Sequence, residues 1–163
     1  MAPSGSLDVD GSLDVVVEAV FLASRELVAV AARSIAAIAD DVTLPQFRAL
    51  VVLAAGEIRN VGALADALGV HPSSATRMCD RLVKRALVRR SVPDDNRREV
   101  VLELSPTGRR LVDDVVKRRR KEIGKIVARL SPADRLQVLR GLAAFGSAAA
   151  EVPRQAQPDW LLP

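Results

Sequence analysis

The stretch from Val61 to Pro106 constrains the fold most, because the spacing of its apolar residues changes along its length. Apolar residues recur at helical spacing up to Val83, and from Val100 to Leu104 they alternate with other residues, as in a strand with one buried side. The elements that fit this change of period are a short helix, a turn, a second helix and a two-stranded hairpin.

The second of these helices has clear start signals and two different faces. His71 occupies the N-cap position and Pro72 the first helical position, where proline loses no hydrogen bond. Five apolar residues then follow the spacing of one buried stripe, namely Ala75, Met78, Cys79, Leu82 and Val83. Opposite them lie Ser73, Arg77, Arg81 and Lys84, and the first turn also carries Ser74 and Thr76.

The polar face of this helix suits contact with DNA. Small polar residues in its first turn allow close approach to base edges and phosphates, and the free backbone N–H groups there favour anions. Arg77, one turn further on, is placed to contact guanine in a major groove. Asp80 is expected to pair with Arg77 and Lys84, which lie at helical spacing from it. Taken alone, the same face also fits an ordinary solvated helix surface.

The hairpin makes the DNA-binding interpretation more specific. Leu87 to Val92 is the expected partner strand, and the segment from Pro93 to Arg97 forms the tip. Arg97 and Arg98 project there beside acidic residues, and a narrow minor groove attracts inserted arginine side chains. A helix-turn-helix followed by an arginine-tipped wing predicts a winged helix-turn-helix that binds DNA.

The rest of the chain is expected to be helical. Aromatic residues make up only 2% of the sequence, so the core has to be built from aliphatic side chains that helices pack closely. Thr43 and Gln46 match a capping box at one helix start, and Ser105 with Pro106 marks another. The predicted fold class is therefore mainly α with a small β-hairpin.

The predicted organisation places a DNA-binding lobe between two sets of long helices. The first long helix is apolar on more than one face, so part of it is expected to pack against a second copy of the chain. Two helices are expected after the lobe, one to about Leu130 and one to about Glu151. The divisions are a flexible lead at 1–12, dimerisation helices at 13–40 and 106–151, the winged lobe at 43–105 and a tail at 152–163.

The composition argues against several kinds of site. Cys79 is the only cysteine and His71 the only histidine, so neither an internal disulfide nor a metal site is expected. The sequence lacks a glycine-rich phosphate loop and a Ser/His/Asp set, so we expect no catalytic residues, no enzyme activity and no cofactor. No export signal is visible and charges interrupt the long apolar helix, so a cytoplasmic protein without a membrane span is expected.

Two stretches carry a more specific similarity, and they read SATRMCDRLVKRALVRR at 74–90 and DDNRREVVLELSPTG at 94–108. They resemble the MarR family, the multiple-antibiotic-resistance type of transcriptional regulator. The family wing commonly reads Asp-x-Arg, then an alternating strand, then Leu-Thr-x-x-Gly. Here Asn96 stands in place of the wing acid and Ser105 in place of the threonine, and serine also caps helices. The resemblance covers roughly Leu13 to Glu151.

This resemblance implies a homodimer that binds double-stranded DNA at a palindromic operator. The first and last helices of two copies would interlock, and two winged lobes would read half-sites about one DNA turn apart. It also implies a repressor released by a small anionic or phenolic ligand, bound near Phe47 and Arg48, although core and surface roles fit those two residues equally well. The residues implied to contact DNA are Ser73, Ser74, Thr76, Arg77, Arg81, Arg97 and Arg98.

Two other functions also fit the sequence. One is a winged-helix protein-interaction module, whose dimer surface and C-terminal Trp160 bind a partner without specific DNA binding. The other is a redox-sensing regulator in which the thiol of Cys79 reacts. The position of Cys79 in the apolar stripe favours a packing role instead.

Overall fold

The computed structural model describes residues 12–56, 58–91 and 100–151. Over these residues the chain forms helices and one two-stranded antiparallel sheet, which confirms the predicted fold class. The predictions for residues 1–11 and for the tail at 152–163, including Trp160, concern residues outside the described ones. The elements in chain order are α1 Leu13–Ala36, α2 Leu44–Ala55, α3 Val61–Leu68, α4 Pro72–Lys84, β1 Val88–Ser91, β2 Val101–Leu104, α5 Pro106–Val127 and α6 Pro132–Glu151.

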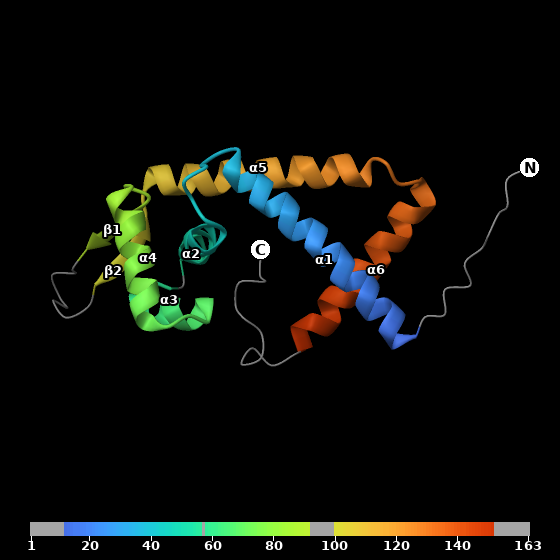
Figure 1. Cartoon of the computed structure of the whole chain (residues 1–163), viewed down its shortest axis with the longest axis horizontal. Helices are drawn as coiled ribbons and strands as arrows, with labels where there is room; N and C mark the ends of the chain where they lie inside the picture. Colours follow the sequence, from blue (N-terminus) through green and yellow to red (C-terminus); the bar gives the residue numbers. More distant parts are fainter. Residues whose placement is uncertain (1–11, 57, 92–99, 152–163) are drawn as a thin grey trace, which may run out of the picture.

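Helix α5 connects two parts of the molecule (Figure 1). The elements α2, α3, α4, β1 and β2, which we call the lobe, lie at its N-terminal end. At its other end α5 leads into α6, while α1 runs obliquely and packs against α5. We call α1 and α6 the arms.

The hydrophobic core lies in the lobe. One fully buried leucine comes from each of its main elements, and these are Leu50, Leu64, Leu82 and Leu102. Val115 of α5 closes the same core from the side of the long helix. The lobe is therefore fixed around the first turns of α5.

The helix starts follow the local signals in the sequence. The Thr43 hydroxyl accepts a hydrogen bond from the Gln46 N–H (3.4 Å), and the Gln46 side chain accepts one from the Thr43 N–H (3.0 Å), which confirms the capping box. Ser105 caps α5, since its hydroxyl oxygen accepts a bond of 2.9 Å from the Gly108 N–H.

Two helix ends fall earlier than predicted. Helix α1 ends at Ala36 rather than about Asp40, and α5 ends at Val127 rather than about Leu130. In both places the chain tightens into bonds between residues three apart, as from the N–H of Ile38 to the carbonyl of Ile35 (3.0 Å). The apolar spacing continues past the point at which the backbone leaves the helix.

Strand register decides which side chains of the hairpin face the core. Val88 pairs with Leu104 and Arg90 with Leu102, and Leu102 is buried. The prediction that Val100 faces the core is wrong, because Val100 precedes β2 and is 41% exposed.

Candidate nucleic-acid interface

The inner face of α4 is fixed in the lobe. Ala75, Cys79 and Leu82 have no exposed surface, while Met78 and Val83 are half-buried. The predicted buried stripe is confirmed. Because these residues anchor three successive turns, the opposite face of α4 has a fixed direction relative to the hairpin.

The start of α4 is ordered by its own side chains. Nδ1 of His71 accepts a hydrogen bond from the Ser73 N–H (3.3 Å) and lies 2.9 Å from the Ser73 hydroxyl. The Thr76 hydroxyl donates to the carbonyl of Pro72 at 2.9 Å. This confirms His71 as the N-cap and Pro72 as the first helical residue, and it restricts the small polar side chains of the first turn.

The outer face of α4 gathers the predicted DNA-contacting residues of this helix. Ser73, Thr76, Arg77 and Arg81 are exposed, and Ser74 is half-buried. Within the described parts of the chain, neither arginine takes part in an ion pair. Two cationic side chains therefore project from a helix whose other face is immobile, an arrangement that suits readout of a polyanion.

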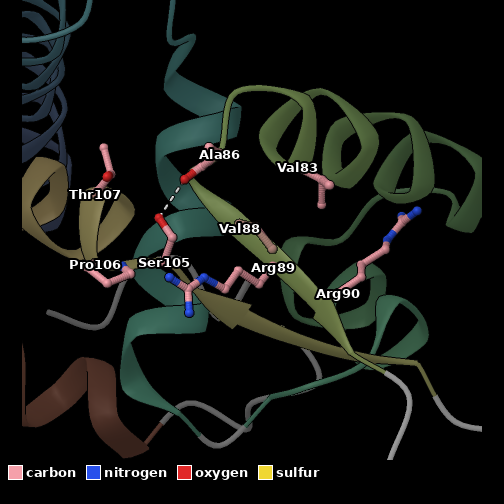
Figure 2. A pocket seen from close by; sticks show the side chains of 8 residues that line it. All are labelled: Val83, Ala86, Val88, Arg89, Arg90, Ser105, Pro106 and Thr107. Carbon is pink, nitrogen blue, oxygen red and sulfur yellow. Dashed lines mark hydrogen bonds between the residues drawn. The ribbon is translucent and has the colours of Figure 1, made fainter.

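The prediction for Asp80 is wrong in its partners. Its carboxylate lies 2.7 Å from the guanidinium of Arg90 in β1, and not beside Arg77 or Lys84. Successive residues of a strand point to opposite sides, so Arg90 reaches α4 while its neighbour Arg89 turns toward Ser105 and Pro106 (Figure 2). The ion pair ties the wing to the recognition helix.

Cys79 lies next to this ion pair. Burial raises the pKa of its thiol, and the charge of Asp80 acts in the same direction while that of Arg90 opposes it. A buried thiol with a raised pKa is a poor nucleophile. The expected packing role of Cys79 agrees with this environment.

The base of the hairpin is held by the start of α5. The Ser105 hydroxyl donates to the carbonyl of Ala86 at 2.6 Å, as Figure 2 shows, and the Ser105 N–H donates to the carbonyl of Leu87 at 3.0 Å. Gly108 follows one turn later, and a Cβ atom there would lie 2.1 Å from the Leu87 carbonyl oxygen. The chain turns from α4 into β1 at Ala86, whose φ of 55° is left-handed.

Two surface hollows lie beside the hairpin. The larger, of about 510 Å³, opens between α4, β1 and the start of α5 (Figure 2), and its lining includes Val83, Arg89 and Thr107. The smaller, of about 250 Å³, is lined by residues that include Arg59 and Arg109. Neither hollow is lined by the residues predicted to hold a ligand.

Those two residues have different surroundings. Phe47 is buried in the lobe core, and Arg48 beside it is half-buried, so that burial lowers the pKa of its guanidinium. Both residues lie in α2, close to its N-terminus. Their role in ligand binding stays a prediction.

Other predicted features fall outside the described residues. Arg97 and Arg98 lie within the segment 92–99, as do the acidic residues expected to brace them. Within the described ranges, no group of three His, Cys, Asp or Glu residues is placed to hold a metal ion. None of the described helices is long and apolar enough to cross a membrane.

Three structural features were not predicted from the sequence. Asn60 caps α3, since its side-chain oxygen accepts a 2.8 Å hydrogen bond from the Ala63 N–H. An asparagine directly before an apolar helical stretch favours such a cap, so the sequence did contain a signal for it. Arg85 binds Asp41, and Arg90 binds Asp80. The first ion pair joins residues 44 positions apart and the second joins a helix to the following strand, so spacing within one element indicates neither of them.

Comparisons with known proteins agree with this geometry. The model of the MarR family matches residues 42–100, which run from just before α2 to just before β2. An uncharacterised HTH-type transcriptional regulator, YfiV of Bacillus subtilis, is 27% identical over 108 residues, which are 66% of this chain and 68% of the relative.

Similar solved structures extend the likeness over the arms. The crystal structure of RV1404 from Mycobacterium tuberculosis has a TM-score of 0.79 and 43% identity, covering 87% of this chain and 97% of that one. An F27L mutant of MepR from S. aureus, solved bound to an oligodeoxyribonucleotide, has a TM-score of 0.65 and 20% identity, with 81% and 96% of the two chains covered. At that identity the likeness to MepR concerns the fold alone.

Proposed function

The chain belongs to the MarR family of transcriptional regulators, and from this premise we propose that it binds a palindromic DNA operator as a homodimer and represses transcription. The family and its curated relatives are regulators rather than enzymes. One observation carries the proposal, namely that α4 anchors one face in the lobe through Ala75, Cys79 and Leu82 and directs Ser73, Thr76, Arg77 and Arg81 outward from the other.

Helix α4 is the proposed reading element. Arg77 lies one turn into the helix, at a position from which a guanidinium reaches guanine O6 and N7 in the major groove. Ser73 and Ser74 are assigned to phosphates, since free N–H groups and small side chains meet at this helix N-terminus. Thr76 and Arg81 complete the contact surface. Arg97 and Arg98 of the wing are proposed to enter the adjacent minor groove.

We propose that the arms pack against the arms of a second copy of the chain. None of the residues of α6, all of which the structure describes, is buried, and Leu139 is 65% exposed. Helix α1 adds a further apolar surface, on which Phe21 is 56% exposed. A single protomer leaves these side chains in water, so pairing of the arms between two copies supplies the missing contacts.

Release by a small molecule is a further part of the proposal. MepR has been solved bound to DNA and also bound to ethidium bromide, the latter with a TM-score of 0.58 to this chain. The proposed ligand is anionic or phenolic and binds near Phe47 and Arg48 in the first half of α2. Since its target is chromosomal DNA, the protein is placed in the cytoplasm.

Replacement of Arg77 tests the reading role of α4. The best-bound operator is first selected from a pool of random DNA with the wild-type protein. Arg77→Ala is then expected to lose about 1–3 kcal/mol of binding free energy and to relax the sequence preference at one position of each half-site. Fluorescence anisotropy at physiological salt measures the loss.

Arg129→Ala is the matched control, because Arg129 is exposed and lies in the connection between α5 and α6, outside the lobe. It removes the same charge and is expected to leave specific binding unchanged. If Arg77→Ala bound the selected operator as tightly as Arg129→Ala, the proposed role of Arg77 would be wrong.

A further inference from the structure

A second ion pair forms at the C-terminal end of α4. Arg85, the C-cap of α4, donates from one guanidinium nitrogen to the backbone carbonyl of Asp41 at 3.0 Å and from the other to the Asp41 carboxylate. These residues are 44 positions apart in the chain. Asp41 lies in the corner where α1 turns into α2, which Figure 1 shows at the inner end of α1.

The corner that carries Asp41 is anchored on both sides. Ile35, before it, is buried in the core, and Val42, directly after Asp41, is 5% exposed. Thr43 then begins the capping box of α2. The carbonyl and the carboxylate of Asp41 are therefore presented in a fixed direction, and the planar fork of Arg85 can match both at once.

The two connected elements belong to different parts of the molecule. Helix α1 is an arm and packs chiefly against α5, whereas α4 packs against α3 and β1 inside the lobe. The ion pair between Asp80 and Arg90 joins α4 to β1, and both of these elements belong to the lobe. Arg85 and Asp41 join the C-cap of α4 directly to the corner through which α1 leads into α2.

We propose that Arg85 and Asp41 are positioning residues that fix the tilt of α4 relative to α1, and thereby set which separation of operator half-sites the dimer prefers. The inference rests on the proposed function, because half-site separation has meaning only for a DNA-bound dimer. In such a dimer the arms hold the two copies together, so the angle between arm and α4 determines the distance between the two reading helices.

The exposure of the Arg85 and Asp41 side chains argues for a positioning role and against a large contribution to folding stability. The side chains of Arg85 and Asp41 are 27% and 64% exposed, and exposed ion pairs contribute little to folding. Loss of the pair is therefore expected to leave the fold intact while the angle of α4 becomes less restricted. The property to measure is therefore the orientation of α4, and not the stability of the protomer.

The test uses a series of operators that keep the selected half-sites and change only their separation, one base pair at a time. For wild type, the ratio of affinities between the best separation and its neighbours defines the spacing preference. Asp41→Asn and Arg85→Gln are each expected to reduce this ratio by about three-fold. Arg85→Lys keeps the charge but not the planar fork, so its ratio is expected to fall between those of wild type and Arg85→Gln.

Asp40→Asn is the matched control, since Asp40 is the exposed neighbour of Asp41 and forms no ion pair among the described residues. It is expected to keep the wild-type ratio. An unchanged ratio in both Asp41→Asn and Arg85→Gln, with operator binding retained, would overturn the positioning role alone. Failure of the wild-type dimer to bind any operator would overturn the proposed function and this inference together.

A distance measurement gives a second result without DNA. Spin labels on Lys84→Cys, in a Cys79→Ala background, report the separation of the two α4 helices in the dimer. The distribution of distances is expected to be broader for Asp41→Asn than for Asp40→Asn. Equal widths for these two variants would contradict the inference.

Discussion

The lobe and the arms differ in how far they bury their apolar side chains. Each element of the lobe contributes to one core, in which Leu50, Leu64, Leu82 and Leu102 are almost completely enclosed. By contrast, α6 has no buried residue, and much of α1 exposes apolar side chains such as Phe21. The lobe buries its apolar side chains within one protomer, whereas the arms leave theirs exposed, and these are the side chains that we propose a second copy covers.

Helix α5 makes the same contrast within one element. Near its start Gly108, Val112 and Val115 are buried against the lobe, and from Val116 onward most residues are exposed. In the proposed dimer, this helix connects the folded lobe to the interface between the two copies. We therefore expect mutations in the lobe to change mainly the stability of the protomer and mutations in the arms to change mainly its assembly.

The largest expected effect is loss of lobe packing. Leu102→Ala removes most of a side chain that is 1% exposed, and the cavity is expected to lower the free energy of unfolding by about 3.5 kcal/mol. Chemical denaturation at fixed protein concentration measures this, because assembly also contributes to apparent stability. A loss below about 1 kcal/mol would mean that the lobe core is less tightly packed than described.

Two glycines of α5 compare its buried and exposed parts. Gly108→Ala places a Cβ atom 2.1 Å from the Leu87 carbonyl oxygen and is expected to cost about 3 kcal/mol of unfolding free energy. Gly124→Ala has nothing within 4 Å and is expected to stabilise by up to about 1 kcal/mol, since alanine favours a helix. Thermal unfolding of the two variants side by side checks the difference, and similar shifts for both would refute it.

A charge on an arm should affect assembly but not the lobe. Leu139→Asp places a carboxylate on the apolar surface of α6 and is expected to weaken the dimer by about 2 kcal/mol. Analytical ultracentrifugation over a range of concentrations measures the dissociation constant. Gln137→Asp, on the same exposed helix, adds the same single negative charge without removing an apolar side chain and is the control. If Leu139→Asp assembled like wild type, another surface would have to join the two copies.

The smallest expected effect concerns the turn between α4 and β1. Ala86 has a left-handed φ of 55°, a conformation that costs a residue with a Cβ atom more than it costs glycine. Ala86→Gly is therefore expected to raise the free energy of unfolding by about 1 kcal/mol. A decrease in the denaturation midpoint would contradict the assigned backbone strain.

The predictable features were those encoded by neighbouring residues. The capping box at Thr43, the cap at Ser105 and the buried stripe of α4 depend on side chains three or four positions apart, and all three were confirmed. The partner of Asp80 was predicted incorrectly because spacing along α4 suggested Arg77, while the folded hairpin brings Arg90 closer. Helix spacing carries no information about a strand that packs across it.

The same limit applies to the candidate site. The outward face of α4 follows from its period, so Ser73, Thr76, Arg77 and Arg81 were placed together correctly from the sequence. The link between Arg85 and Asp41 was not predictable, because it requires the relative position of α1 and α4. Contacts with DNA by any of these residues stay a prediction.

Footprinting on the DNA upstream of the gene tests the central claim most directly, namely that the lobes read DNA through α4 while the arms join two copies. We expect two protected segments of inverted symmetry, centred about 10 base pairs apart, with protection weakened in Arg77→Ala. A preparation shown to be dimeric that gave no protection at low salt would contradict the account and favour a winged-helix protein-interaction module instead.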